Sequence, residues 1–379
     1  MRRALCAIML FVASVEPSAK LRNVGSIELD LNDYYSYEGV MDYLDTLAKD
    51  YPNRVFLKDA GRTYENRMLK TITISNGDGV PGKRTIFMDA ELHAREWMTP
   101  MAALYAIHQL VVNFKENADL LKNFNWIVLP LANPDGYEFS RNSDRWWRNN
   151  RSPNGRQCFG TNLNRNFDVA WGQGYSELAD PCTESFAGSE PFSEAEARLV
   201  RDIMHELVDN GSGTMYLSLH TANRSMFYPW VYESSPTRNH HELKEIARFA
   251  TDRILRETGT EIKPKQAYYY GGMVGGTSLD YAFKVGFPLS FVFEMSGLAF
   301  GVEYKFFPPP TAIRRLTTET WVGIRALAEK AIEKYPPGRA IPAIQRKPVS
   351  NRAPGSQDLN ILVGLLSTLL AYVASHLTS

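Results

Sequence analysis

The sequence predicts an α/β fold in which helices cover both faces of a central sheet. Five segments have the composition of strands, and they carry apolar residues on both faces. Strands of that kind are buried on both sides, so a helix layer is expected on each face of the sheet. Five amphipathic helical segments alternate with these strands, which is the pattern of an α/β domain. No linker interrupts the alternation between residues 34 and 335, so a single domain is expected there.

The individual elements follow from the spacing of apolar residues and from helix-start signals. Thr99 and Pro100 open the second predicted helix, and Ser193 with Glu196 has the spacing of a capping box at the start of the third. The expected strands are residues 68–75, 84–90, 125–132, 213–220 and 288–295, and the expected helices are residues 37–51, 99–114, 193–208, 240–258 and 315–335.

Polar side chains stand where four of these strands end. His93 and Glu96 follow the second strand, Asn133 follows the third, His220 ends the fourth and Glu294 lies near the end of the fifth. Ligands of open α/β sheets gather at the carboxyl ends of the strands. One turn can aim His93 and Glu96 at a single ion, and His220 can supply a third ligand. Two histidines, one carboxylate and an open fourth position make a catalytic zinc site.

Charge and cysteine content narrow the classes of function. Lysine plus arginine equals aspartate plus glutamate at 42 each, so no net field favours nucleic acid. Cys6 lies near the N-terminus, which leaves Cys158 and Cys182 as a pair. In an oxidising compartment this pair is expected to form a structural disulfide, with two unrelated free thiols as the alternative.

The two ends of the chain differ from the middle. Residues 1–19 have the basic start, apolar stretch and small residues of a signal peptide, with an irregular N-terminus as the alternative. Residues 336–351 are expected to form a stalk. Residues 352–379 have the order of a glycolipid-anchor (GPI) signal, with Asn351 as the preferred attachment site and Gly355 or Ser356 next. A tail in the membrane and a plain C-terminal helix are the alternatives. The expected location is extracellular, at the cell surface or secreted.

Sequons at Asn150, Asn210 and Asn223 permit glycosylation, and Asn210 is favoured because the other two lie near the expected site.

Six motifs occur in the order found in zinc carboxypeptidases of the carboxypeptidase A/B family. They are HAREW, NPDGYEFSRNSDRWWRNNRS, CFGTNLNRNFD, LSLH, GGTSLDYA and FVFEM. The chain resembles this family from about Tyr34 to Tyr335. The resemblance implies a mixed, mostly parallel twisted sheet with helices on both faces. It also implies an exopeptidase that hydrolyses the C-terminal bond of peptides and proteins with one Zn²⁺ per chain, here expected to be a monomer.

The resemblance assigns a role to each matching residue of the catalytic centre. It makes His93, Glu96 and His220 the zinc ligands. It makes Glu294 the general base, which takes a proton from the zinc-activated water and passes it to the leaving amine. Arg148 matches the arginine that stabilises the oxyanion of the tetrahedral intermediate.

The resemblance also assigns the residues that hold the substrate. Asn164 and Arg165 match the pair that clamps the terminal carboxylate, for which a planar guanidinium is well suited. Arg95 and Arg145 resemble secondary substrate contacts. A tyrosine is expected to close over the carboxylate, and Tyr270 is preferred to its neighbours Tyr268 and Tyr269.

Selectivity is expected to follow from the pocket position at Leu279. Relatives with basic specificity carry an acid there, and Val292 lines the same pocket, so an uncompensated lysine or arginine would pay a desolvation penalty. Apolar C-terminal residues are therefore expected. Phe227 and Val231 narrow the pocket, which favours aliphatic side chains over large aromatic ones. A basic or acidic preference, or a weakly active or inactive peptide-binding relative, are the alternatives.

Two departures from the family stand out. Asn162 replaces the aspartate that normally bonds a zinc-bound histidine, which predicts an active but weakened enzyme because such partners affect metal affinity and activity. Only a short segment precedes the catalytic domain, where digestive relatives carry an inhibitory pro-segment. With the anchor-like tail, this resembles the carboxypeptidase O arrangement, unless the sequence is truncated.

Overall fold

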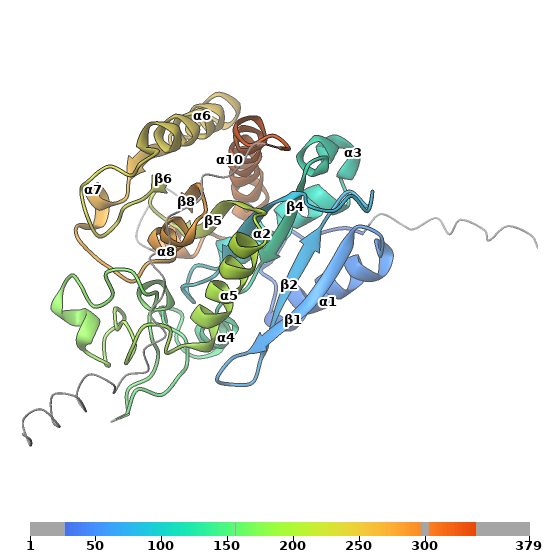
Figure 1. Ribbon diagram of the computed structural model, residues 1–379. Helices are drawn as coiled ribbons and strands as arrows, with labels where there is room; N and C mark the ends of the chain where they lie inside the picture. The colour runs from blue at the N-terminus through green and yellow to red at the C-terminus, as the bar shows by residue number, and fades with distance from the viewer. Residues whose placement is uncertain (1–26, 156, 296, 298–302, 339–379) are drawn as a thin grey trace, which may run out of the picture. The chain divides into compact units, whose positions relative to one another are not determined.

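The computed structural model describes residues 27–155, 157–295, 297 and 303–338. The predicted signal peptide, the predicted anchor signal and the stalk beyond residue 338 lie outside these residues. Within the described part, eight strands form one sheet in the order β1-β2-β4-β3-β5-β8-β6-β7 (Figure 1). The strands are β1 (Val55–Arg62), β2 (Met68–Ile74), β3 (Arg84–Ala90), β4 (Phe124–Leu129), β5 (Gly213–Thr221), β6 (Ser225–Tyr228), β7 (Lys263–Gln266) and β8 (Leu289–Met295).

The sheet is mixed, as the sequence predicted. Strands β4, β3, β5 and β8 pair in parallel, and β6 pairs in parallel with β7. The β1–β2, β2–β4 and β8–β6 pairs are antiparallel. Every residue of β3 and of β5 is buried. Because both faces of these strands are covered, the central strands appear in the sequence as continuous apolar runs.

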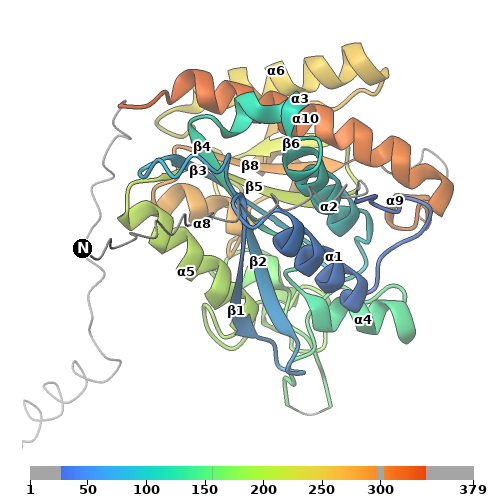
Figure 2. The same cartoon turned by 90° about the vertical axis from the view of Figure 1, so that its right-hand side faces the viewer.

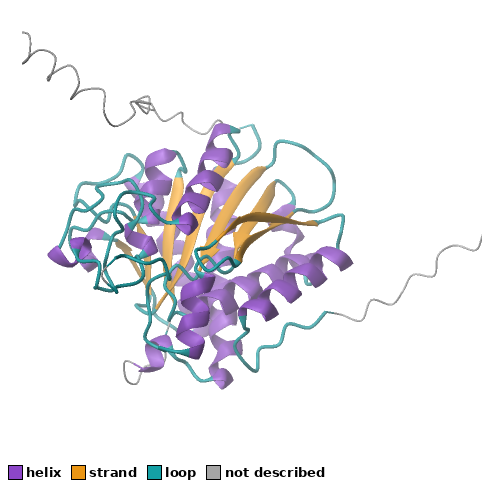
Figure 3. Ribbon diagram, turned by 90° about the horizontal axis from the view of Figure 1, so that it is seen from below, coloured by secondary structure: helices purple, strands orange, loops and turns teal. Residues whose placement is uncertain are grey.

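Helices lie on both faces of the sheet (Figure 3). They are α1 (Tyr37–Asp50), α2 (Met98–Val111), α3 (Phe114–Asn117), α4 (Pro134–Asn142), α5 (Ala195–Asp209), α6 (His240–Thr258), α7 (Tyr268–Gly271), α8 (Ser278–Val285), α9 (Glu303–Phe306) and α10 (Ile313–Lys334), with 3₁₀ turns at Ala118–Leu121, Leu163–Arg165, Ser176–Ala179 and Pro310–Ala312.

The two helix layers are separate (Figure 2). On one face α1 joins α2 through a 2.8 Å contact between the Tyr43 hydroxyl and Nδ1 of His108, and α10 packs on α2 and α6. On the other face α5 and α8 cover the sheet, where Met204 and Tyr281 share a core with Phe87 and Tyr216 of the central strands.

The differences from the sequence prediction lie at the sheet edges and at one helix start. Strands β1, β6 and β7 were not predicted; β1 is largely exposed, and β7 is a polar run of four residues. The capping box at Ser193 is wrong, because α5 begins at Ala195 with no side-chain cap. The Ser193 hydroxyl instead donates to Glu194 and accepts from Nδ2 of Asn166.

One further prediction can be compared with the structure. Cys158 and Cys182 form the predicted disulfide. Among the described residues, no helix is long and apolar enough to cross a membrane.

Candidate active site

Three neighbouring strands bring the candidate site residues to one edge of the sheet. His93 and Glu96 lie in the turn after β3, and the Ala94 amide of that turn donates to the Arg148 carbonyl over 2.9 Å. Strand β5 lies between β3 and β8, and its His220 pairs in register with Glu294 of β8. Residues far apart in sequence therefore meet at the carboxyl ends of parallel strands, where ligand sites of such sheets occur.

The two histidines and Glu96 converge on one point. Nδ1 of His93 lies 2.9 Å from Oε1 of Glu96, and Nδ1 of His220 lies 3.2 Å from Oε2. The two Nδ1 atoms are 3.1 Å apart. All three side chains are buried, with their ligand atoms within 4.8 Å of one another. Two ring nitrogens that face each other across a shared carboxylate need a cation or protons between them, and this donor set suits catalytic zinc.

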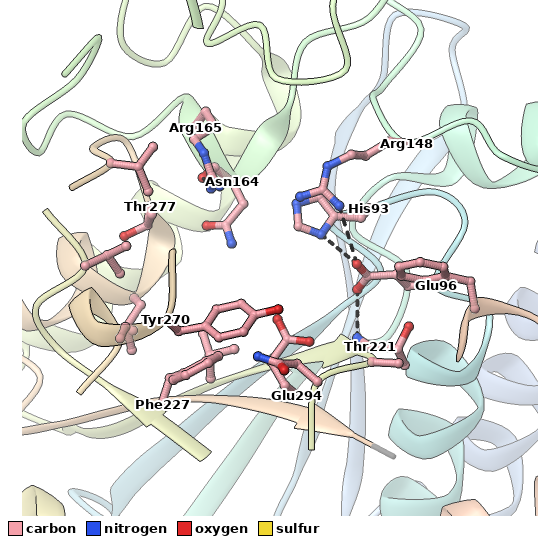
Figure 4. Close-up of a pocket in the computed structure, with 18 of the residues that line it drawn as sticks. His93, Glu96, Arg148, Asn164, Arg165, Thr221, Phe227, Tyr270, Thr277 and Glu294 are labelled. Atoms are coloured by element: carbon pink, nitrogen blue, oxygen red, sulfur yellow. Dashed lines mark hydrogen bonds and ion pairs between the residues drawn. The ribbon is translucent and has the colours of Figure 1, made fainter. Parts of the chain in front are cut away.

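Electrostatics act differently on the three ligands. Burial acts to lower the pKa of His220, but Glu96, Glu294 and Asp89 outweigh it and raise that pKa, so a metal ion there competes with a proton. Burial, assisted by Arg148, lowers the pKa of His93 well below its usual value, so the ring is neutral as a ligand must be. Burial acts to raise the pKa of Glu96, but His93 and His220 outweigh it and hold that pKa below its usual value. Glu96 also accepts a 3.0 Å hydrogen bond from the Thr221 amide (Figure 4).

The outer nitrogen of each histidine is also held. Nε2 of His93 lies 3.3 Å from Oδ1 of Asn162, whose Nδ2 donates to the Glu184 carbonyl and so fixes the amide orientation. Nε2 of His220 lies 3.1 Å from the Ser218 hydroxyl, which donates to buried Asp89. These contacts leave Nδ1 of both rings facing the metal position. Such partners orient the ring and tune the ligand.

Glu294 and Arg148 face the same cavity as two of the ligands. Burial raises the pKa of Glu294 to about 7. Nη1 of Arg148 lies 3.7 Å from Oε1 of Glu96, and burial lowers the pKa of Arg148 to about 10, at which it stays charged. The cavity therefore holds a carboxylate able to exchange protons near neutral pH beside a fixed positive charge.

The cavity has a volume of about 350 Å³ and two unlike ends. Its apolar end is lined by Leu279, Val292, Phe227 and Val231, of which the first three are buried and packed together. Asn164 and Arg165 line the same cavity, and Tyr270 lies across from them (Figure 4).

Asn164 and Arg165 are held against the start of α8. Oδ1 of Asn164 accepts from the Ser278 amide over 2.9 Å, which leaves Nδ2 as its donor. Nε of Arg165 is buried with no hydrogen-bond partner among the described residues. Gly276 permits this packing, because its φ is +75° and an added Cβ would lie 2.0 Å from the Arg165 carbonyl oxygen.

The fold and the site agree with a known family. The pattern described as zinc carboxypeptidase matches residues 40–323. The chain belongs to the zinc carboxypeptidase family.

The carboxypeptidase is similar to several relatives over most of its length. It is 36% identical to carboxypeptidase B of Helicoverpa zea over 313 residues, which cover 80% of this chain and 72% of the relative. It is 30% identical to carboxypeptidase O of Bos taurus over 309 residues, 80% of each chain. The crystal structure of carboxypeptidase A from Helicoverpa armigera has a TM-score of 0.75 at 34% identity, covering 80% of this chain and 75% of that one. The predicted family is thus confirmed: the protein is a zinc metallocarboxypeptidase that acts on peptide C-termini.

Two predicted substrate contacts lie outside the cavity of this carboxypeptidase. Arg95 lines a neighbouring cavity, where its Nη1 and Nη2 lie 2.8 and 3.3 Å from the Glu184 carboxylate. Arg145 is sandwiched between the rings of Trp97 and Phe307, with its guanidinium carbon 3.4 and 3.6 Å from their centroids. Its Nη atoms donate to the carbonyls of Arg95 and Phe306. In this structure Arg145 therefore contacts the protein and lines neither cavity.

Of the three tyrosines considered for the carboxypeptidase, Tyr270 lines the cavity and points its hydroxyl toward Glu294 (Figure 4). Its ring centroid lies 5.1 Å from that of Phe227. Tyr269 is 70% exposed, and neither it nor Tyr268 lines the cavity.

Sequence reasoning missed several residues of the carboxypeptidase site. Asp89 could have been noticed as a lone acid in an apolar strand. The cavity is also lined by Asn223, which the sequence indicated only as a sequon near the site, and by residues that carried no signal of function in the sequence, namely Thr221, Ala222, Ala267, Val274, Thr277, Lys305 and Phe306.

Proposed function

We propose that this carboxypeptidase removes apolar residues from peptide C-termini, with Glu294 as general base. The observation that carries the proposal is that one cavity is lined by apolar side chains around Leu279, by Arg165, and by His93 and Glu96 of the metal-binding triad. A peptide C-terminus has the matching arrangement, because its last residue carries an apolar side chain and a carboxylate, and the scissile carbonyl of the penultimate residue comes directly before it.

His93, Glu96 and His220 would hold the zinc ion. Zinc bound there supplies a Lewis acid that polarises the scissile carbonyl and makes water more acidic. The remaining chemistry belongs to Glu294, which accepts a proton from the attacking water and later gives it to the leaving amine. A carboxyl with a pKa of about 7 suits both transfers near neutral pH.

Arg165 and Arg148 have different tasks in the proposed reaction. Arg165, with its unpartnered Nε, and Nδ2 of Asn164 bind the terminal carboxylate, and the Tyr270 hydroxyl covers it from the opposite wall. Arg148 stabilises the oxyanion, an interaction that typically contributes about 3 kcal/mol when it is preorganised.

The apolar preference rests on the chemistry of the pocket wall. Leu279 and Val292 are 1% and 6% exposed, and none of the described residues at this end of the cavity is charged. A lysine or arginine side chain would be desolvated there without a partner. Because Phe227 and Val231 add bulk to the wall, aliphatic side chains are favoured over large aromatic ones.

The test is a panel of hippuryl-type substrates ending in Phe, Leu, Arg and Glu, assayed on purified protein with and without a chelator. Leu is expected to give the highest kcat/KM, followed by Phe, and the chelator should abolish turnover in a way that added zinc restores. Highest turnover of the Arg substrate would overturn the argument from Leu279.

We also propose that residues 34–335 form the catalytic domain of a secreted monomer, attached to the cell surface by a glycolipid near Asn351. The Cys158–Cys182 disulfide supports an oxidising compartment. Release from cells by phosphatidylinositol-specific phospholipase C would support the anchor, and retention after that treatment would contradict it.

Glycosylation is proposed at Asn210, which is exposed. The Asn150 side chain is buried and donates to Glu194, and Nδ2 of Asn223 is buried, so neither is available for a glycan.

A further inference from the structure

Lys305 is a cation of the cavity to which the proposed mechanism gives no role. It lies on α9, is exposed, and lines the same cavity as Glu294 together with its neighbour Phe306. Among the residues that the structure describes, none forms an ion pair with it. A lysine held at the mouth of a binding cavity without a partner is available to a charged ligand.

The backbone beside Lys305 is fixed to the metal-binding turn. Nη2 of Arg145 donates to the Phe306 carbonyl over 3.2 Å, and Nη1 donates to the Arg95 carbonyl over 3.1 Å. The Arg95 guanidinium carbon also lies 4.9 Å from the centroid of the Phe306 ring. Arg145 thus bridges α9 and the turn that carries His93, so Lys305 keeps its place at the cavity mouth.

The arginines that line this cavity or the neighbouring one each have an anion assigned to them. Arg165 is assigned to the substrate carboxylate, and Arg148 to the oxyanion. Arg95 is neutralised by Glu184 through two contacts. Among the described residues that line this cavity, Lys305 is the cationic side chain to which no anion has been assigned.

The position of α9 indicates which part of a substrate meets Lys305. In the proposed function the C-terminal side chain occupies the apolar end at Leu279, and Phe306 of α9 contacts Arg95 of the metal-binding turn. Arg148 lines both this cavity and the neighbouring one that contains Arg95. A peptide that enters the apolar end therefore leaves past Arg148 and α9, which places the penultimate residue beside Lys305.

We propose that Lys305 selects substrates with an acidic penultimate residue, through an ion pair between its ammonium group and the carboxylate of that residue. This inference rests on the proposed function, since it places the substrate C-terminus at Leu279 and Arg165. An ion pair at a solvent-accessible cavity mouth contributes modestly, so about a fivefold preference for glutamate over glutamine is expected.

The experiment compares blocked dipeptides X-Leu in which X is Glu, Gln or Lys. The enzymes are the zinc-loaded wild type, Lys305→Met, Lys305→Glu and, as control for the same change of charge, Lys263→Glu on exposed β7. The measured quantity is the ratio of kcat/KM values between substrates at low and high salt. A second series moves the charge one residue further upstream.

The wild type and Lys263→Glu should prefer Glu about fivefold over Gln at low salt, and less at high salt. Lys305→Met should abolish that preference, and Lys305→Glu should favour Lys.

Unchanged Glu-to-Lys ratios in Lys305→Glu, or an effect confined to the upstream series, would overturn the assignment of Lys305. Failure of the wild type to cleave any X-Leu substrate would instead overturn the proposed function itself.

Discussion

The two ends of the cavity are built on different principles. At the metal end, buried charged groups from the strand ends hold one another, as Glu96 does with His93, His220 and the Thr221 amide. At the apolar end, side chains from α8, β8, β6 and the segment after β6 meet only by packing. A charged network loses function when one member is removed, whereas a packed wall changes which side chain fits. The reaction should therefore be sensitive at the first end, and selectivity adjustable at the second.

The largest effect is expected at the metal end, from Glu294→Gln. The amide cannot take up a proton, so kcat should fall about 10³-fold or more, while zinc content stays unchanged because Glu294 is not among the three converging ligands. The measurements are hydrolysis of a Leu-terminated peptide and metal analysis, with exposed Glu257→Gln as control. If Glu294→Gln kept a tenth of the wild-type activity, Glu294 would not be the general base.

The next largest effect is expected at the apolar end, from Leu279→Asp. A carboxylate in this wall should lower kcat/KM for a Leu-terminated substrate about 100-fold and raise it for an Arg-terminated one. The zinc content should not change, because Leu279 is not among the three converging ligands. Leu279→Ile is the control that keeps the wall apolar. Unchanged preferences in the aspartate variant would show that the C-terminal side chain binds elsewhere.

Asn162→Asp should act on the metal end without touching substrate. A carboxylate facing Nε2 of His93 would make the ring a better ligand, so zinc affinity should rise about 10-fold or more. Chelator competition measures this, with Asn210→Asp as an exposed control. A zinc affinity equal to the wild type would mean that the neutral amide already orients the ring as well as the acid does.

A further prediction concerns stability at the apolar end. Burial raises the pKa of Asp280 to about 7, and its carboxylate accepts from the Val231 and Tyr232 amides, with Glu233 also raising this pKa. Because the folded state binds this proton more tightly than the unfolded state, the stabilisation is present below pH 4 and is lost as the pH rises to about 7.

The contribution of Asp280 should fall by at most about 1.4 kcal/mol per pH unit across this window. Denaturant unfolding from pH 4 to 8 should show a weaker pH dependence in Asp280→Asn than in the wild type. Parallel curves would mean that Asp280 titrates normally.

The sequence predicted the centre of the fold and the metal end better than the edges and the cavity mouth. Buried strands and amphipathic helices follow from local periodicity, and His93, Glu96 and His220 stand at strand ends. The exposed strand β1 and polar β7 lack such a pattern. The ring sandwich around Arg145 and the place of Lys305 depend on contacts between segments more than a hundred residues apart, which local patterns do not encode.

The register of β8 makes the enzyme intolerant of length changes in one strand. Val292 and Glu294 are two residues apart and both line the cavity, so the pocket wall and the proton acceptor project from the same side of β8. The deletion or insertion of a single codon ahead of them would turn both away and present their phenylalanine neighbours instead. Point mutations can therefore change selectivity gradually during evolution, whereas the insertion or deletion of one residue in β8 would abolish selectivity and catalysis together.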